Sequence, residues 1–281
     1  MISYANLSRR AALLMGIAAA LPVASQALEE VPFITSPDNV TLEMLQSAKV
    51  GASDYVIDLG SGDGRIVITA AKRFGARGLG VEIVPDLVKK SNDNAQAAGV
   101  ADKVEFREQD IFKTDLSQAS VITMYLLPDV NLQLRPAILA LKPGTRIVSH
   151  DWDMGDWKPD RTTVVPVPDK KVGLEKSSKI HLWVVPAQVQ GLWCGTVLLR
   201  GSRIAVEQSF QTFKGTMTLG SRVREYEGTI DGPLLRSLPT ARTQLTLEFK
   251  NNQLHLVAGD GPVGLLKGSS LTLSSTGSCD S

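Results

Sequence analysis

The stretch Asp58–Arg65 has the sequence Asp-Leu-Gly-Ser-Gly-Asp-Gly-Arg and continues the apolar run Tyr55–Leu59. The pattern predicts a strand, a loop with glycine at every second position, and then a helix. Glycine adopts positive φ readily and lets a ligand approach the backbone without a Cβ in the way. The N–H groups that open the next helix point toward such a ligand. The alternative is a glycine-rich turn that binds nothing.

The spacing of Gly60, Gly62 and Gly64 separates two classes of cofactor. A dinucleotide fingerprint requires a glycine three residues after the second one, and Arg65 occupies that position. The observed Asp-x-Gly-x-Gly-x-Gly resembles the first motif of the seven-strand S-adenosylmethionine (SAM) methyltransferases. In that family the loop meets the methionyl part of the cofactor, and the leading acid, here Asp58, lies beneath it.

Further acids follow the next two predicted strands. The strand Gly78–Val81 ends in Glu82, where a carboxylate can accept hydrogen bonds from both ribose hydroxyls. The strand Val104–Arg107 is followed by Asp110, which matches the family residue that meets the adenine amino group. A single acid at the end of a strand is usually solvated, but acids after three successive strands favour a nucleoside site.

Alternating strands and helices predict an α/β fold for residues 28–187, with a parallel sheet and helices on both faces. Ser36 and Pro37 are expected to open the first helix as N-cap and first helical residue. Thr163–Val167 and Ile180–Val185 predict an antiparallel hairpin at the sheet edge, because only a charged turn separates them. This arrangement resembles the Rossmann-like seven-stranded methyltransferase sheet with an antiparallel terminal hairpin, whereas the alternative, a plain Rossmann sheet, would require another helix there. The other expected elements are strands 55–59, 78–82, 104–107, 120–125 and 145–149, and helices 65–74, 85–98 and 130–141.

Residues 188–281 predict a small all-β domain, because no helical period of useful length occurs there. Short alternating runs punctuated by Gly, Ser, Asn and Pro are typical of a sandwich or a barrel. Nothing in this domain carries recognisable chemistry, and its role stays open. The predicted strands are Thr196–Leu199, Ile204–Phe210, Thr216–Leu219, Gly228–Ile230, Gln244–Phe249, Leu254–Val257 and Leu271–Leu273.

Residues 1–27 have the pattern of a secretory signal peptide. Ser8-Arg9-Arg10 precedes the apolar run Ala11–Val23, which is too short for a membrane span, and small residues precede Leu28. The paired arginines are compatible with twin-arginine export, but Ala12 stands where that signal prefers a large apolar residue, so the Sec route stays open. An organelle transit peptide is the remaining alternative. We expect an exported, periplasmic protein whose mature chain has no membrane span.

The two cysteines, Cys194 and Cys279, both lie in the predicted β domain. An even pair in an exported chain predicts a disulfide, since the first and last strands of a sandwich or barrel are often neighbours. The alternative is a buried Cys194 and an unpaired Cys279. Neither cysteine has the spacing of metal ligands and the three histidines are scattered, so no metal site is expected.

Composition limits the classes of partner. The chain has 281 residues, a net charge of +1 and 43% hydrophobic residues. The length predicts about two domains with real cores. The near-zero net charge gives no electrostatic reason to expect a nucleic-acid partner.

Residues 31–187 resemble one branch of the seven-strand methyltransferases. That branch includes the lysine methyltransferases that modify the ATP synthase c subunit in mitochondria, and exported bacterial relatives of unknown substrate. The resemblance implies SAM as cofactor, with binding residues Thr35, Asp58, Gly60, Gly62, Glu82 and Asp110. The matching pieces are Val31-Pro32-Phe33-Ile34-Thr35, Asp58–Ile68, Gly80-Val81-Glu82, Asp110, Tyr125-Leu126-Leu127-Pro128, Ser149-His150-Asp151 and Trp157-Lys158-Pro159.

The segment after the fourth strand bears on the acceptor. It has Tyr125–Pro128 in place of the Asn/Asp-Pro-Pro-Tyr motif of amide and nucleobase amine methylation, which argues against a nucleic-acid acceptor. A lysine acceptor must be a neutral amine, so burial or a nearby base has to lower its pKa. Tyr125, His150, Asp151 and Trp157 are the candidates for the acceptor side, and a solvated strand end is the alternative for His150 and Asp151.

Three functional hypotheses follow. The first is a SAM-dependent methyltransferase acting on an unknown protein or small-molecule acceptor, with protein lysine as one such acceptor. The second is an exported, non-catalytic module that keeps the nucleoside site, because SAM is made in the cytosol. The third is a structural role in which the β domain contacts envelope partners.

Overall fold

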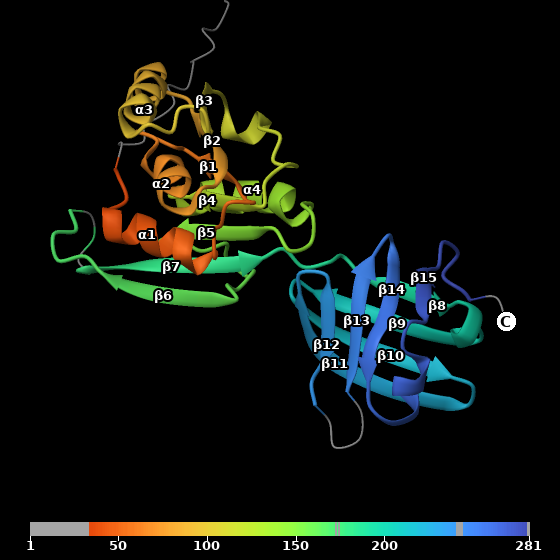
Figure 1. The fold of residues 1–281 in the computed structure, drawn as a ribbon. Helices are drawn as coiled ribbons and strands as arrows, with labels where there is room; N and C mark the ends of the chain where they lie inside the picture. The colour runs from red at the N-terminus through yellow and green to blue at the C-terminus, as the bar shows by residue number, and fades with distance from the viewer. Residues whose placement is uncertain (1–33, 172, 174, 240–243, 280–281) are drawn as a thin grey trace, which may run out of the picture. The chain divides into compact units, whose positions relative to one another are not determined.

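The computed structural model describes residues 34–171, 173, 175–239 and 244–279, which form an α/β sheet domain followed by a β-barrel (Figure 1). The predicted signal peptide, residues 1–27, lies outside the described residues, as do Val31–Phe33 of the family-like lead-in. In the part of the chain that is described, no helix is both long and apolar enough to cross a membrane.

The sheet has seven strands in the order β3-β2-β1-β4-β5-β7-β6. Its first five strands are parallel, and β7 is antiparallel to both β5 and β6. The predicted parallel sheet with an antiparallel terminal hairpin is confirmed. The strand order reverses between β1 and β4, and ligands of open α/β sheets bind at such a switch point, beyond the carboxyl ends of the strands. The strands are β1 Tyr55–Leu59, β2 Arg77–Glu82, β3 Val104–Glu108, β4 Val121–Met124, β5 Arg146–His150, β6 Arg161–Pro166 and β7 Ser177–Val184.

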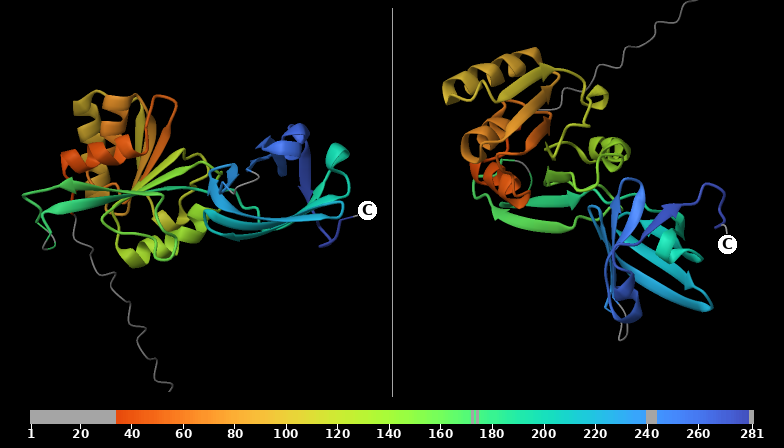
Figure 2. Two further views of the ribbon diagram at one scale, coloured as in Figure 1. Left: turned by 90° about the horizontal axis from the view of Figure 1, so that it is seen from below. Right: turned by 45° about the vertical axis from the view of Figure 1, so that its right-hand side comes forward.

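Helices cover both faces of this sheet, as the left view of Figure 2 shows. Alternate residues of a strand point to opposite faces, so Val56 packs in the cluster that holds α1 and α2, while its neighbour Ile57 packs in the cluster that holds α4. Asp58 therefore shares the face of Val56. The helices are α1 Asp38–Ser47, α2 Arg65–Phe74, α3 Pro85–Ala98 and α4 Pro128–Leu139, with a short 3₁₀ helix, η1, at Ile111–Lys113.

The start of α1 differs from the prediction. The helix begins at Asp38, the capping position is Pro37, and Ser36 makes no capping hydrogen bond. Instead, the Ser36 hydroxyl lies 2.8 Å from Nδ1 of His150 at the end of β5. The predicted N-cap was wrong because a buried imidazole, distant in sequence, uses this hydroxyl.

The C-terminal part is a closed eight-stranded barrel in the order β10-β11-β12-β13-β14-β15-β8-β9. Alternate strand residues point inward and form one apolar core that includes Trp193, Phe213 and Tyr226. The barrel confirms the predicted small antiparallel β fold. Its strands are β8 Gly191–Gly195, β9 Ser202–Ser209, β10 Thr212–Leu219, β11 Arg222–Asp231, β12 Leu234–Ser237, β13 Leu245–Lys250, β14 Gln253–Gly259 and β15 Ser270–Leu273, with 3₁₀ helices η2 Val197–Leu199 and η3 Gly261–Leu266.

Three details of the barrel were predicted wrongly, the first being that its first strand is β8, Gly191–Gly195, which was not predicted. The expected strand Thr196–Leu199 is largely the 3₁₀ helix η2, because Val197 has a φ of 45°, which no strand accommodates. The strand β12 was not predicted, since its four residues are too few to show an alternating pattern.

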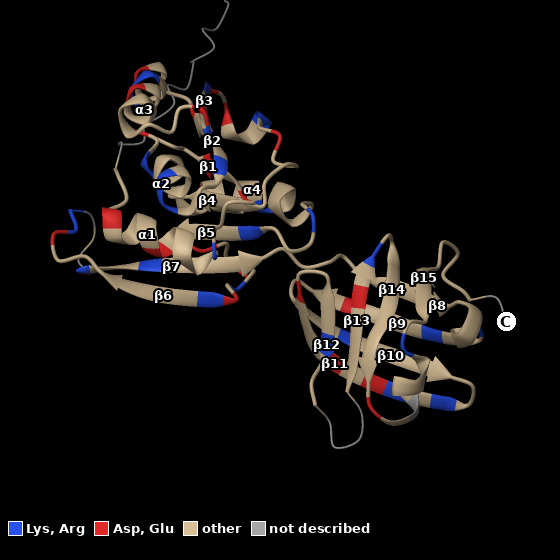
Figure 3. Cartoon of the chain, in the orientation of Figure 1, with Lys and Arg blue, Asp and Glu red and all other residues tan. Residues whose placement is uncertain are grey.

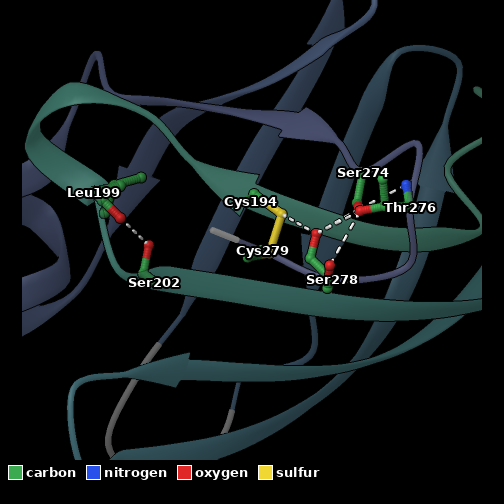
Figure 4. Close-up of a disulfide and its surroundings, with 7 residues drawn as sticks. All are labelled: Cys194, Leu199, Ser202, Ser274, Thr276, Ser278 and Cys279. Carbon is green, nitrogen blue, oxygen red and sulfur yellow. Dashed lines mark hydrogen bonds between the residues drawn. A yellow bond between two sulfur atoms is a disulfide. The ribbon is translucent and has the colours of Figure 1, made fainter. Parts of the chain in front are cut away.

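The two cysteines form a disulfide, drawn in Figure 4. Cys194 lies in β8, which pairs antiparallel with β15, and Cys279 follows β15. Their Cα atoms are 5.5 Å apart. The predicted bridge between the first and last strands is confirmed, and the alternative of an unpaired Cys279 is wrong.

Candidate active site

The glycine loop between β1 and α2 is folded tightly. Gly60, Gly62 and Gly64 have φ values of 74°, 54° and 78°, which favour glycine strongly over other residues. A Cβ on Gly60 would lie 2.9 Å from Cδ2 of Leu126, so the segment after β4 packs directly against the loop. A Cβ on Gly64 would lie 2.7 Å from the ring of Phe106.

Side chains from α3 and α2 hold this loop. Ser91 Oγ donates to the Gly62 carbonyl at 2.8 Å, and Asn94 Nδ2 donates to the Asp63 carbonyl at 2.9 Å. Arg65 pairs with the Asp63 carboxylate through Nη2 at 2.7 Å and also donates from Nη1 to the Ser36 carbonyl at 3.0 Å. Burial alone would raise the pKa of Asp63, but the hydrogen bonds and charge of Arg65 outweigh it and lower that pKa.

Asp58 is buried at the carboxyl end of β1, with 2% of its surface exposed. Thr123, its register partner on β4, donates from Oγ1 to Oδ1 of Asp58 at 2.7 Å. Burial raises the pKa of Asp58 to about 7; the Thr123 hydrogen bond opposes this rise, and the nearby carboxylates of Glu82 and Asp63 add to it. A bound cation would relieve this repulsion.

Glu82 ends β2 and accepts three backbone hydrogen bonds. Its Oε2 accepts from the N–H of Gly62 at 2.9 Å, and its Oε1 accepts from Ile83 at 2.8 Å and Val84 at 3.1 Å. A carboxylate oxygen has two lone pairs, so Oε2 can accept one further hydrogen bond. Glu82 therefore stabilises the glycine loop and still has capacity to accept from a ligand hydroxyl.

Asp110 follows β3 and opens η1. Its Oδ1 accepts from the N–H of Phe112 at 2.9 Å, and its Oδ2 lies 3.6 Å from Nζ of Lys113. Phe112 and Ile83, which lie within two residues of Asp110 and Glu82 along the chain, are more than half exposed. The exposed apolar side chains fit the aromatic base of SAM, and the two acids beside them can accept hydrogen bonds from its polar groups. The buried carboxylate at the glycine loop fits its positive charge.

Tyr125 and His150 stack on each other beside the segment that carries Leu126. Their ring centroids are 3.9 Å apart at an interplanar angle of 29°. His150 is 1% exposed, and its Nδ1 and Nε2 lie 2.8 Å and 2.9 Å from the hydroxyls of Ser36 and Ser178. Burial lowers the pKa of His150 to about 4, against the opposing effect of the Asp151 carboxylate. The imidazole is therefore neutral at pH 7, and it is not a solvated strand end.

Asp151 has a φ of 63°, a strained value for a residue other than glycine. Its Oδ2 lies 2.8 Å from Nζ of Lys170, and its Oδ1 accepts from the N–H of Lys179 at 2.9 Å. Burial would raise the pKa of Asp151, but the hydrogen bonds from Lys170 and Lys179 outweigh it, and the pKa is lowered. This carboxylate is ionised at neutral pH and ties the end of β5 to the β6–β7 hairpin.

The remaining candidates occupy different environments. Thr35 is half-buried and directly precedes Ser36, while Trp157 is fully buried beside Trp183 and belongs to the core. Trp152 and Leu127, from the segments after β5 and β4, are each more than one-third exposed.

The polar residues that hold Asp58 and His150 in place were not predicted from the sequence. Ser36, Thr123 and Ser178 are buried hydroxyl residues, each bonded to Asp58 or His150. Thr123 had a signal, since it is the polar residue in the apolar strand Val121–Met124. Asn131 of α4 had a weaker one; it is fully buried and donates to the carbonyls of Trp152 and Asp153 at 3.3 Å and 3.2 Å. The described residues contain no group of three or more His, Cys, Asp or Glu side chains that could hold a metal ion.

Comparison with known proteins agrees with this geometry. The family model described as the ANTKMT methyltransferase domain matches residues 58–161. A protein-lysine N-methyltransferase of Saccharolobus islandicus is 39% identical over 157 residues, which is 55% of this chain and 94% of that protein. The chain belongs to this methyltransferase family. It is a SAM-dependent methyltransferase with a seven-stranded catalytic sheet.

Two further relatives bear on the acceptor. A lysine N-methyltransferase of Mus musculus, named for the c subunit of ATP synthase, is 34% identical over 155 residues, which is 54% of this chain and 62% of that protein. A solved RNA methyltransferase of Salinibacter ruber, in complex with S-adenosyl-L-homocysteine, is 52% identical with a TM-score of 0.50, and the match covers 56% of this chain and 96% of that one. Each of these three relatives matches little more than half of this chain.

Proposed function

We propose that the protein transfers the methyl group of SAM to a lysine amine of a protein acceptor. The observation that carries the proposal is the contact of Leu126 with the glycine loop, 2.9 Å from the position of a Gly60 Cβ, because it places the segment that carries Tyr125 against this loop. The names of the Saccharolobus and mouse relatives support lysine as the acceptor.

An RNA acceptor is the second candidate, and the name of the Salinibacter structure favours it. Two features of this chain argue against an RNA acceptor. The segment Tyr125–Pro128 lacks the Asn/Asp-Pro-Pro-Tyr motif of nucleobase amine methylation, and the net charge of +1 provides no strong field for a polyanion.

For the cofactor, we assign three carboxylates and the glycine loop to different parts of SAM. Asp58 balances the positive charge beside Gly60 and Gly62, Glu82 accepts from the ribose through its remaining lone pair on Oε2, and Asp110 lies on the adenine side. When bound, SAM supplies a methyl group on a cationic sulfur. Thr35, just ahead of α1, is assigned to the edge of the same site.

On the acceptor side, Tyr125 is the residue that we expect to contact the lysine. The half-buried, apolar ring of Tyr125 would displace water from a lysine ammonium ion placed against it. Because desolvation disfavours the charged form, the pKa of that lysine would fall and it would lose its proton more readily. Most of the rate then comes from holding the neutral amine in line with the methyl group. His150 and Asp151 are assigned positioning roles, because His150 is buried and neutral with both nitrogens engaged, and Asp151 is paired with Lys170.

We further propose that the protein is exported to the periplasm. The signal-like pattern of residues 1–27 and the Cys194–Cys279 disulfide support export, since such bonds persist in oxidising compartments. Replacing Arg9 and Arg10 with lysine tests the route: a twin-arginine substrate would accumulate in the cytosol, whereas a Sec substrate would still be processed. Unprocessed wild-type chain in the cytosol would remove the export proposal.

The acceptor is tested by incubating the purified protein with SAM carrying a labelled methyl group, together with envelope protein or total RNA from the source cells. Label in the protein fraction, released as methyl-lysine on acid hydrolysis, is the expected result. Label in RNA alone would overturn the lysine proposal. Gly60→Val is the matched inactive control, because its side chain would collide with Leu126 at a φ of 74°.

A further inference from the structure

Most of the exposed apolar side chains of the barrel gather at one of its two ends. Three of the connections at this end are residues 196–203, from the end of β8 into the start of β9, the β10–β11 turn with its flanking residues 219–225, and residues 260–268 between β14 and β15. Strand pairing places them together, since Leu219 of β10 is the register partner of Ser202 of β9, and Thr196 bonds to Ser270 at the start of β15. We call these three connections the barrel rim.

Four apolar rim side chains are at least 62% exposed to solvent. Val197 is 81% exposed, Leu198 72%, Val223 62% and Leu265 86%. Their neighbours Leu199 of η2 and Val263 of η3 are buried in the core, and Leu266 of η3 packs against it, so both 3₁₀ helices are anchored inward while other residues are held outward. A monomeric soluble protein has little reason to keep such a cluster in water.

The backbone at Val197 adds a second observation. Its φ of 45° is a true outlier for a β-branched residue. Strain of this kind persists where the surrounding structure enforces it, often at functional positions. Here the strained residue is one that is held out into solvent.

The rim is also basic. Its exposed cations outnumber its acids, Glu225 and Asp260, by five to two. The salt bridges within the described barrel join Lys214 to Glu227 and Arg236 to Asp231, so they use none of the rim cations. Figure 3 draws Lys and Arg in blue, and blue segments occur on several strands of the barrel. The cations are Arg200, Arg203, Arg222, Arg224 and Lys267.

We propose that the barrel rim docks on the surface of an anionic lipid bilayer. Each rim connection pairs apolar side chains with a cation one or two residues away: Leu198 with Arg200, Val223 with both Arg222 and Arg224, and Leu265 with Lys267. Loop tips of this kind insert apolar side chains at the headgroup level while the cations meet lipid phosphates. A planar bilayer contacts several separate tips at once, which favours it over a protein segment that would need a continuous groove. The barrel would then hold the methyltransferase at a membrane, whichever acceptor the enzyme methylates.

The test is flotation of the full chain with vesicles of phosphatidylethanolamine and phosphatidylglycerol, with phosphatidylcholine vesicles as the neutral comparison. We expect binding to the anionic vesicles that weakens in high salt. The variant Val197→Ser/Leu198→Ser/Leu265→Ser should bind at least about tenfold more weakly, and Arg222→Gln/Arg224→Gln about fivefold more weakly per cation removed.

Matched controls come from the opposite end of the barrel. Leu273 is about half exposed and Lys250 is exposed, and the variant Leu273→Ser/Lys250→Gln should bind as the wild type does. The single variant Leu265→Ser, which removes little buried surface, guards against a folding defect in the triple variant. Residues 1–27 are common to all these proteins, so they cannot explain a difference between them. The proposal is overturned if the wild type fails to bind anionic vesicles, or if the rim and control variants bind equally.

Discussion

At the residue scale, the glycine loop is surrounded by three carboxylates. Only one of the three is paired with a cationic side chain of the described residues. Asp63 is paired with Arg65, and Glu82 accepts three backbone N–H groups, whereas Asp58 is buried with a single hydroxyl donor. Its pKa of about 7 is the consequence. A site of this kind is less stable empty at neutral pH than it would be with a cation bound.

The first prediction concerns stability without cofactor. The folded pKa of Asp58 lies above its ordinary value of 3.8, so between pH 3.8 and about 7 the folded state binds more protons than the unfolded state. The contribution of Asp58 to the free energy of unfolding therefore falls as pH rises through this window. Asp58→Asn keeps an acceptor for Thr123 and should raise the free energy of unfolding at pH 8 by roughly 1–4 kcal/mol. Urea unfolding at pH 5 and pH 8 measures this, and an identical pH dependence in both proteins would contradict it.

The second prediction concerns SAM binding to the same residue. If Asp58 must be ionised in the complex, the affinity for SAM should rise about tenfold between pH 6 and pH 8, with release of a proton. Calorimetry in two buffers of different ionisation enthalpy detects that proton. Asp58→Asn should bind SAM more weakly, and the proton that the wild type releases on binding should no longer be released. Equal proton release by the two proteins would assign the titration to another group.

A third prediction separates positioning from acid–base catalysis at His150. His150→Phe keeps a ring against Tyr125 but loses the hydrogen bonds to Ser36 and Ser178. We expect kcat to fall about ten- to a hundredfold with the shape of the pH–rate profile unchanged, because the imidazole is already neutral above about pH 5. Ser36→Ala and Ser178→Ala, which each remove one bond, should reproduce part of the loss. Loss of an ionisation between about pH 6 and pH 7 in His150→Phe would instead identify a general base.

At the scale of elements, the sheet was the most predictable part of the chain. The bounds of β1, α2 and α3 agree with the prediction because apolar periodicity and terminal glycines such as Gly75 and Gly99 mark them locally. The glycine loop was equally local, since its spacing alone separates SAM from dinucleotides. The residues behind the loop were not predictable, because the bonds of Ser36 to His150 and of Thr123 to Asp58 join segments 114 and 65 residues apart.

The packing of β2 against β3 and the loop provides a fourth prediction. A Cβ on Gly80 would collide with the ring of Phe106, and a Cβ on Gly64 would collide with the same ring at 2.7 Å. Gly80→Ala should lower the free energy of unfolding by about 1–3 kcal/mol, and Phe106→Leu in the same chain should recover part of it. Gly64→Ala should not be recovered, because its φ of 78° is strained for alanine whatever the space. A double-mutant cycle by urea unfolding checks both, and equal recovery at the two glycines would contradict the distinction.

On the scale of the whole molecule, the two parts are stabilised differently. The methyltransferase sheet contains no cysteine and is held by three apolar clusters with helices on both faces. The barrel has one apolar core and closes through β8 and β15, the pair of strands that the disulfide also joins. Reduction of the disulfide should therefore destabilise the barrel and leave the cofactor site intact.

That difference leads to the last prediction. Cys194 and Cys279 are 85 residues apart, and closing a loop of this length stabilises the folded state by about 4.5 kcal/mol in the chain-entropy model. Cys194→Ser/Cys279→Ser should exchange amide hydrogens faster in β8 and β15 than the wild type, with unchanged exchange in β1 and β4 and unchanged affinity for SAM. Hydrogen exchange followed by mass spectrometry resolves these segments, and alkylation of the unreduced wild type verifies the bridge beforehand. Unchanged exchange in β8 would mean that strand pairing alone closes the barrel, whereas faster exchange in β1 would show that the two parts unfold together.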